Sequence, residues 1–122
     1  MILVDTSVWV DHLRKSNKVL AGQLDSGMVL VHPFVIGELA LGNLKQRELV
    51  LNLLANLPQA AVATDAEVLK FVERHALFER GIGYVDVHLL AAVQLTAAAV
   101  LWTHDKRLHD VAVQLGSARM PP

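Results

Sequence analysis

The sequence predicts an α/β domain in which helices cover both faces of a parallel sheet. Short apolar runs of strand length, such as residues 1–4 and 28–31, are each followed by a segment with helical spacing of apolar side chains. Strands that alternate with helices favour a parallel sheet, because each helix returns the chain across one face of the sheet. At 122 residues the chain has the length of a single domain, residues 1–122, with one hydrophobic core.

The first half of the chain is expected to hold two strands and four helices. The strands are residues 1–4 and 28–31, and the helices are residues 8–14, 18–24, 33–42 and 46–57. Thr6 and Ser7 offer hydroxyl caps to the first helix, because a side-chain oxygen can accept a free N–H of the first turn. Pro33 suits the first turn of the third helix, and Pro58 ends the fourth.

The second half is expected to contain strands at residues 60–63 and 99–102. Thr64 and Glu67 have the spacing of a capping box, which predicts a helix from there to about residue 78. Helices at residues 84–98 and 106–115 follow, the last one capped by Asp105 and ended by Gly116. Residues 117–120 are expected to add an edge strand.

The composition excludes several classes of protein. The 11 Lys and Arg against 12 Asp and Glu give a net charge of −1, so the chain is not a strongly basic nucleic-acid binder. Cysteine is absent, which excludes disulfides and thiolate metal sites. The longest apolar stretch, residues 89–102, is shorter than the ~20 residues of a membrane span, and only four apolar residues precede Asp5. We therefore expect a cytoplasmic protein without a membrane segment or signal peptide.

Four carboxylates interrupt or adjoin apolar runs. Asp5 follows residues 1–4, Glu38 lies within 34–41, Asp86 precedes 89–93 and Asp105 follows 100–104. Burying lone carboxylates is costly, and burying several together is worse unless a cation joins them. Because ligands bind beyond the carboxyl ends of parallel strands, Asp5 and Asp105 are expected to meet at one edge of the sheet. The set predicts a divalent metal site and metal-dependent phosphodiester chemistry.

Each acid also has a purely structural interpretation. Asp5 and Asp105 are well placed as helix N-caps, Asp86 as an acid favoured by the dipole of the helix it begins, and Glu38 as a surface side chain. The metal hypothesis therefore depends on all four together.

Oxygen-rich sites select magnesium or manganese over zinc. Without a metal, mutual repulsion should raise the pKa of one or more of the acids.

Ser7 and Thr103 are candidates to orient a carboxylate or a metal-bound water. His104 lies beside Asp105 and is expected near the site, whereas His88 is expected on a partly exposed helical face.

Four short motifs in this order and spacing resemble the PIN domain, and more closely the VapC-type toxins of toxin–antitoxin pairs. They are residues 4–9 (VDTSVW), 37–39 (GEL), 85–92 (VDVHLLAA) and 101–105 (LWTHD). The resemblance covers essentially the whole chain. It implies a three-layer α/β/α fold with a central parallel sheet and a Mg²⁺- or Mn²⁺-dependent endoribonuclease.

The resemblance also implies roles and partners. The acids that hold the metal in this family fall on Asp5, Glu38, Asp86 and Asp105, and Thr103 matches the hydroxyl before the last acid. Such toxins dimerise, act on structured RNA and are neutralised by a small VapB-like antitoxin. The 53% of hydrophobic residues fits two such interfaces.

Other interpretations remain for comparison. A haloacid-dehalogenase-like phosphatase needs a second acid two residues after Asp5, where Ser7 stands, and a response-regulator receiver needs an acidic pair that the chain lacks. A PIN-like binding module without catalysis is the main alternative, and the presence of all four acids argues against it.

Overall fold

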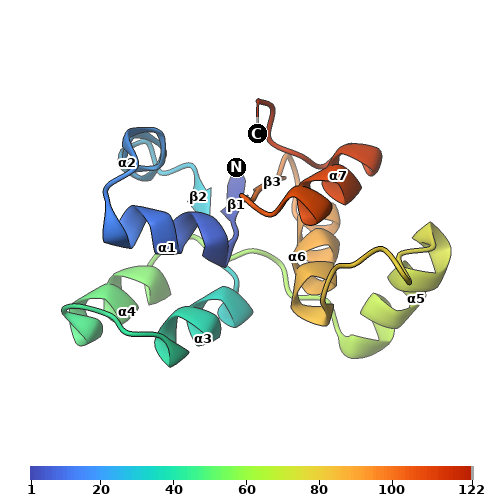
Figure 1. The fold of residues 1–122 in the computed structure, drawn as a ribbon, viewed down its shortest axis with the longest axis horizontal. Coiled ribbons are helices and arrows are strands. Elements are labelled where there is room, and N and C mark those ends of the chain that lie inside the picture. The colour runs from blue at the N-terminus through green and yellow to red at the C-terminus, as the bar shows by residue number, and fades with distance from the viewer. Residues whose placement is uncertain (122) are drawn as a thin grey trace.

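A parallel sheet lies at the centre of the molecule, with helices on both sides of it (Figure 1). The computed structural model describes residues 1–121. The strands are β1 (Ile2–Val4), β2 (Val29–Leu30) and β3 (Val100–Trp102), in the order β2-β1-β3 with parallel neighbours. The α/β class and the parallel sheet are thus confirmed, although β2 is shorter than expected.

The helices separate into two groups along the sequence. Helices α1 to α4 lie on one side of the view in Figure 1, and α5 to α7 lie on the other. Their bounds are α1 (Thr6–Arg14), α2 (Lys18–Asp25), α3 (Pro33–Leu41), α4 (Arg47–Ala55), α5 (Asp65–His75), α6 (Tyr84–Leu95) and α7 (Lys106–Gln114). All seven were expected from the sequence. Helix α1 begins earlier than predicted because Asp5, not Thr6 or Ser7, is its N-cap.

The two outer strands that the sequence predicted are reduced to single bridges. Gln59 pairs with Val31 beside β2, and the Ala60 N–H donates to the Val31 carbonyl at 2.9 Å. The ladder would next need an N–H from residue 33, but Pro33 has none, so pairing ends there. The Ala61 N–H points away from β2 and donates to Thr96 Oγ1 at 3.0 Å. On the other edge, Ala118 forms one parallel bridge with Leu101. The predictions of strands at 60–63 and 117–120 are therefore wrong as extended elements, although both segments cover an edge of the sheet.

The central helix of the core is α6. Residues 87–93 are buried without a break, because α6 packs against α5 and β3. This confirms the interpretation of the long apolar stretch as a core helix that leads into a core strand. Within residues 1–121, no helix combines the length and the apolar character that crossing a bilayer requires.

The register of the sheet aligns the ends of its strands. Val4 of β1 lies opposite Trp102 of β3, and the Asp5 N–H donates to the Trp102 carbonyl at 2.9 Å. The next residues, Asp5 and Thr103, therefore leave the sheet side by side at its carboxyl edge. Parallel pairing thus joins two segments almost a hundred residues apart.

A glycine in the loop before α6 offers a test of this architecture. Gly81 has a φ of +76°, and an added Cβ would lie 2.7 Å from Nη1 of Arg107. We expect Gly81→Ala to lower the unfolding free energy by about 1–2 kcal/mol, chiefly through the left-handed backbone.

The matched control is Gly22→Ala inside α2, where nothing lies within 4 Å of the new Cβ. This change should raise stability by about 0.5–1 kcal/mol, because alanine favours the helix interior. Chemical denaturation measures both changes, and equal effects at the two positions would contradict the assigned backbone.

Candidate active site

The Asp5 side chain joins the ends of two strands. It follows β1, is only 6% exposed, and caps α1 by accepting the Thr6 N–H at 2.8 Å through Oδ1. Its second oxygen, Oδ2, accepts the hydroxyls of Ser7 at 2.8 Å and Thr103 at 2.7 Å. Thr103 follows β3, so this carboxylate links α1 and the β3–α7 turn to one point.

The two hydroxyls are oriented by backbone donors. Ser7 Oγ accepts the His104 N–H at 3.0 Å, and Thr103 Oγ1 accepts the Asp105 N–H at 3.0 Å. Each hydroxyl therefore accepts one hydrogen bond from the backbone and donates its own hydrogen bond to Asp5 Oδ2. Three of the roughly four lone-pair positions of this carboxylate are then used by the protein, which leaves one on Oδ1.

Asp86 is half-buried in the first turn of α6, where its Oδ2 accepts the Gly83 N–H at 2.9 Å. Burial raises the pKa of its carboxyl, and the negative charges of Asp5, Asp105 and Glu38 raise it further against the opposing hydrogen bond. The fold therefore brings Asp5, Glu38 and Asp105 into electrostatic range of Asp86.

Glu38 and Asp105 differ from the sequence-based expectation, because both are exposed. Glu38 was expected beside core side chains, but its helical neighbour Leu41 is itself 90% exposed. Glu38 Oε1 accepts the Thr6 hydroxyl at 2.6 Å, and Asp105 caps α7 by accepting the Leu108 N–H at 3.0 Å. Of the four acids, only Asp5 is buried.

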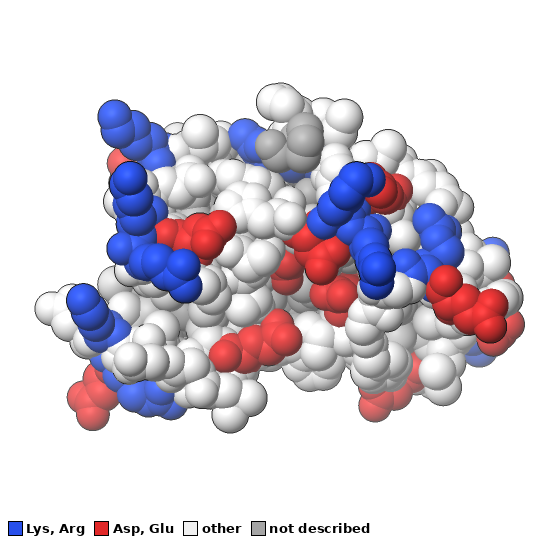
Figure 2. All heavy atoms as spheres, in the orientation of Figure 1, with Lys and Arg blue, Asp and Glu red and all other residues white. Residues whose placement is uncertain are grey.

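The four acids do not form a ready coordination sphere. Within residues 1–121, no three His, Asp or Glu side chains converge in a geometry that would hold a metal ion. Each carboxylate is instead turned toward a hydrogen-bond donor of the protein, and like charges favour this separation. Figure 2 shows acidic side chains across the middle of this face, with Lys and Arg on both sides.

Two hollows adjoin the acids. A groove of about 450 Å³ between α1 and the end of α3 contains Glu38, with Arg14 and Lys45 in its lining. A second hollow of about 380 Å³ lies at the β3–α7 turn and includes Asp105 and Lys106. The acidic centre is therefore open to a ligand from two sides, with a cation on each.

Three histidine interactions were not predicted from the sequence. His88 is 2% exposed, so the expectation of a partly exposed residue was wrong, and its Nε2 lies 3.1 Å from Asp65 Oδ1. His32, which is also buried, caps α3 by accepting the Phe34 N–H through Nδ1. His104 Nδ1 lies 2.6 Å from Asp11 Oδ2, so its ring pairs with an acid outside the set of four. The unbroken apolar run around His88 was the signal for its burial.

Comparison with known proteins identifies the family of this chain. The sequence matches the family model of the PIN domain over residues 2–114, which is most of the chain. The chain belongs to the PIN-domain family. It is also 52% identical over 118 residues to proteins named ribonuclease VapC32 from two strains of Mycobacterium tuberculosis, CDC 1551 / Oshkosh and H37Rv. The alignment covers 97% of this chain and 95% of each relative.

The charge of Asp86 should reduce the stability of this PIN domain when no metal is bound. Because its pKa is raised, the folded state holds the Asp86 proton more tightly than the unfolded state does. The stability that this proton contributes is present at low pH and is lost as pH rises through the folded-state pKa. In Asp86→Asn the amide cannot ionise, and its oxygen still accepts the Gly83 N–H. We expect the unfolding free energy at pH 7 in EDTA to rise by a few tenths to about 1 kcal/mol.

The gain should shrink as pH falls through the raised folded-state pKa of Asp86, and it should vanish below the ordinary aspartate pKa of 3.8. The control is Asp110→Asn, because the hydrogen bond from Lys106 holds the pKa of Asp110 below its usual value. That change should be neutral or destabilising at pH 7. A destabilised Asp86→Asn would show that the carboxylate has a structural partner that outweighs the repulsion.

The Thr103 hydroxyl is expected to be important for stability. Thr103→Val keeps the shape but leaves the Asp105 N–H and Asp5 Oδ2 each without one partner, so it should cost about 1–3 kcal/mol. Thr103→Ser retains the hydroxyl and should recover most of that loss. Equal destabilisation by the two variants in urea unfolding would assign the effect to the methyl group instead.

Proposed function

We propose that this chain is the toxin of a VapC-type toxin–antitoxin pair and acts as a metal-dependent endoribonuclease. The observation that carries the proposal is that Asp86 is influenced by the charges of Asp5, Glu38 and Asp105, in a chain 52% identical to named ribonucleases. Three other acids within electrostatic range of Asp86 disfavour its ionised form, and a cation bound near the carboxyl edge of the sheet would offset that repulsion.

The donor set fits Mg²⁺ or Mn²⁺. All candidate ligands are carboxylate oxygens, from Asp5, Glu38, Asp86 and Asp105, and magnesium and manganese prefer such ligands. When bound, the metal makes a water more acidic and polarises the phosphate. The absence of a converged set within residues 1–121 implies that the side chains of Glu38, Asp86 and Asp105 reorient on binding.

The candidate metal ligands differ in how tightly the protein holds them. Asp5 is held by Thr6, Ser7 and Thr103, so its carboxylate has a defined position before any ligand arrives. Glu38 and Asp105 are exposed and each accepts a single hydrogen bond from the protein, so they can turn toward a cation at low cost.

Cations on both sides of the acids would hold the RNA backbone. Arg14 and Lys45 line the groove beside Glu38, and Lys106 lines the hollow beside Asp105. Lys and Arg side chains bind phosphates without regard to sequence, so they position RNA across the acids rather than select it.

The same proposal includes partners and location. Exposed apolar side chains on several helices offer area for a VapB-like antitoxin and for a homodimer. They include Leu13, Leu41, Leu49, Leu53 and Leu69. An enzyme that acts on cellular RNA, regulated by such an antitoxin, would work in the cytoplasm.

A non-catalytic PIN-like binding module is the second candidate. It is favoured by the lack of three carboxylates in a metal-binding geometry within residues 1–121. The two functions differ in one measurable respect, because only the enzyme cleaves RNA in a way that needs both metal and acids.

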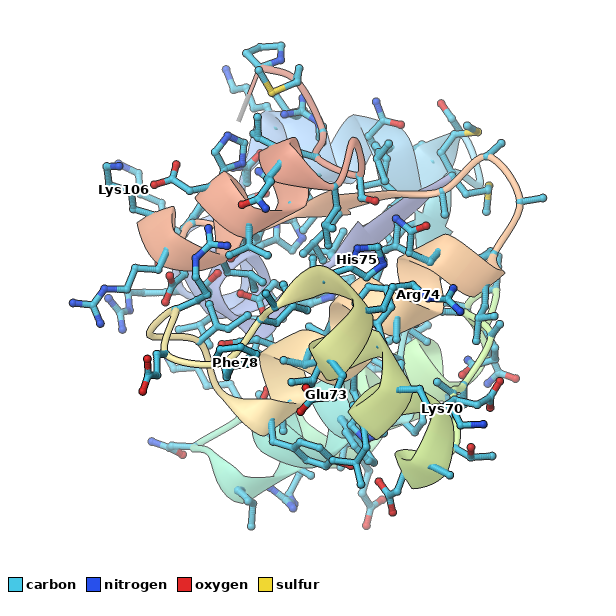
Figure 3. The ribbon with its side chains drawn as sticks, turned by 90° about the vertical axis from the view of Figure 1, so that its right-hand side faces the viewer. Lys70, Glu73, Arg74, His75, Phe78 and Lys106 are labelled. Carbon is cyan, nitrogen blue, oxygen red and sulfur yellow. The ribbon has the colours of Figure 1, made fainter. Side chains whose placement is uncertain are left out.

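The enzyme should cut purified bacterial RNA into discrete fragments when Mg²⁺ or Mn²⁺ is present, and EDTA should abolish the cleavage. We expect Asp86→Asn to lower the rate at least about 100-fold, because it removes a candidate ligand at little risk to the fold. Glu73→Gln is the matched control, since Glu73 is an exposed acid of α5 (Figure 3). Gel electrophoresis and sequencing of fragment ends provide the readout.

Two results would contradict the nuclease. Cleavage that persists in EDTA or in Asp86→Asn would point to a contaminant or to a different chemistry. A wild-type protein that leaves RNA intact with both metals would favour the binding module.

A further inference from the structure

Three aromatic rings form a continuous cluster between α3 and α6. Phe34 of α3 and Tyr84 of α6 each meet the ring of His88 edge to face, with centroid separations of 4.7 Å and 4.8 Å. Phe34 is 37% exposed and Tyr84 is 48% exposed, whereas His88 is buried beneath them. Phe34 and Tyr84 therefore present aromatic surface to solvent from a shared buried support.

Hydrogen bonds to an exposed carboxylate of α5 hold two of these rings in place. Asp65 at the start of α5 accepts both the Tyr84 hydroxyl at 2.7 Å and the His88 Nε2–H at 3.1 Å through Oδ1. These two bonds lower the pKa of Asp65, so it stays ionised as their common acceptor. His32 packs against Phe34 at 5.1 Å, and burial together with the charge of His88 lowers its pKa to about 4. Both exposed rings are thus positioned by neighbours that an ordinary surface aromatic does not have.

The cluster adjoins the candidate active site along both helices. Phe34 lies four residues before Glu38 in α3, so the two side chains share one face of that helix. Tyr84 follows Gly83, whose N–H binds the Asp86 carboxylate. Phe34 therefore shares a helix face with Glu38, and Tyr84 lies in the same first turn of α6 as Asp86.

We propose that Phe34 and Tyr84 form a stacking platform for an unpaired nucleobase of the RNA, beside the phosphate held at the four acids. The inference extends the proposed function, because it names a base-binding subsite of the same centre. An acidic centre with a metal can hold a phosphate but offers nothing to a base, and exposed aromatic rings bind any base through its π-face. The platform is therefore a positioning device for single-stranded RNA.

Binding of a short fluorescein-labelled single-stranded RNA, with Ca²⁺ present to limit cleavage, tests the platform directly. Phe34→Leu and Tyr84→Leu should each weaken binding about ten-fold, as expected for loss of one stacked base. Tyr84→Phe keeps the ring and should bind like the wild type, even though it loses the bond to Asp65.

The matched control is Phe71→Leu. Phe71 of α5 meets His75 with the same 4.7 Å separation and 61° angle as the Phe34–His88 pair, but it lines a groove against Ala91 and Leu95, near the far end of α6 from Asp86. Figure 3 labels Lys70, Arg74 and His75 around this part of α5. Phe71→Leu should leave RNA affinity unchanged, and thermal melting should show that all four variants are folded.

The possible results separate the two proposals. Normal RNA affinity in Phe34→Leu and Tyr84→Leu, equal weakening in Phe71→Leu, or no RNA binding by the wild type would overturn the platform. A wild type that binds RNA through these rings but does not cleave it with Mg²⁺ would overturn the nuclease alone. Where cleavage occurs, Phe34→Leu should raise KM with little change in kcat, and an abasic nucleotide beside the cut should add no further loss in that variant.

Discussion

The structure depends on two hydrogen bonds that one carboxylate oxygen of Asp5 accepts from hydroxyl groups. Through Oδ2 the carboxylate holds Ser7 of α1 and Thr103 after β3, and each hydroxyl in turn accepts a backbone N–H from the β3–α7 turn. A buried carboxylate is tolerated here because protein donors replace its lost hydration. The same bonds fix the position of Asp105, whose N–H belongs to this network. Removing one partner therefore affects the sheet edge and the acidic centre together.

The structural and functional interpretations of the acids are compatible. Asp5 and Asp105 are N-caps, and Asp86 binds the N–H of the residue before α6. Helices that begin just after parallel strands need caps at one edge of the sheet, and aspartate is a good cap. Local capping thus gathers negative charge at a place where ligands bind. The raised pKa of Asp86 is the electrostatic consequence of that gathering.

Helix α6 belongs both to the hydrophobic core and to the candidate active site. Its middle forms the core through an unbroken buried segment, while its first turn carries Asp86 and Tyr84 at the carboxyl edge of the sheet. His88 connects the two, since it is buried with the core but bonded to Asp65 at the surface. A polar side chain in such a position needs a partner, and α5 supplies it. The stability of the core and the geometry of the edge are coupled through this helix.

The sequence by itself determined the α/β class, all seven helices and the three paired strands. Periodic apolar spacing, the capping box at Thr64 and Glu67, and Pro33 are local signals that survive folding unchanged. The outer strands were not predictable in this way, because their length depends on the register in which they pair. Gln59 lies opposite Val31, so the next donor from the β2 side falls on Pro33, which has no N–H.

The site shows the same division. Interrupted apolar runs, which are visible in the chain, selected the four acids. Ser7 and Thr103 were selected because each lies two residues from one of these acids. Only the tertiary structure decided that Asp5 is buried whereas Glu38 and Asp105 are exposed, and that His88 lies beneath Phe34 and Tyr84. Burial and charge coupling depend on what packs from other elements, and neither is encoded in the neighbours of a residue along the chain.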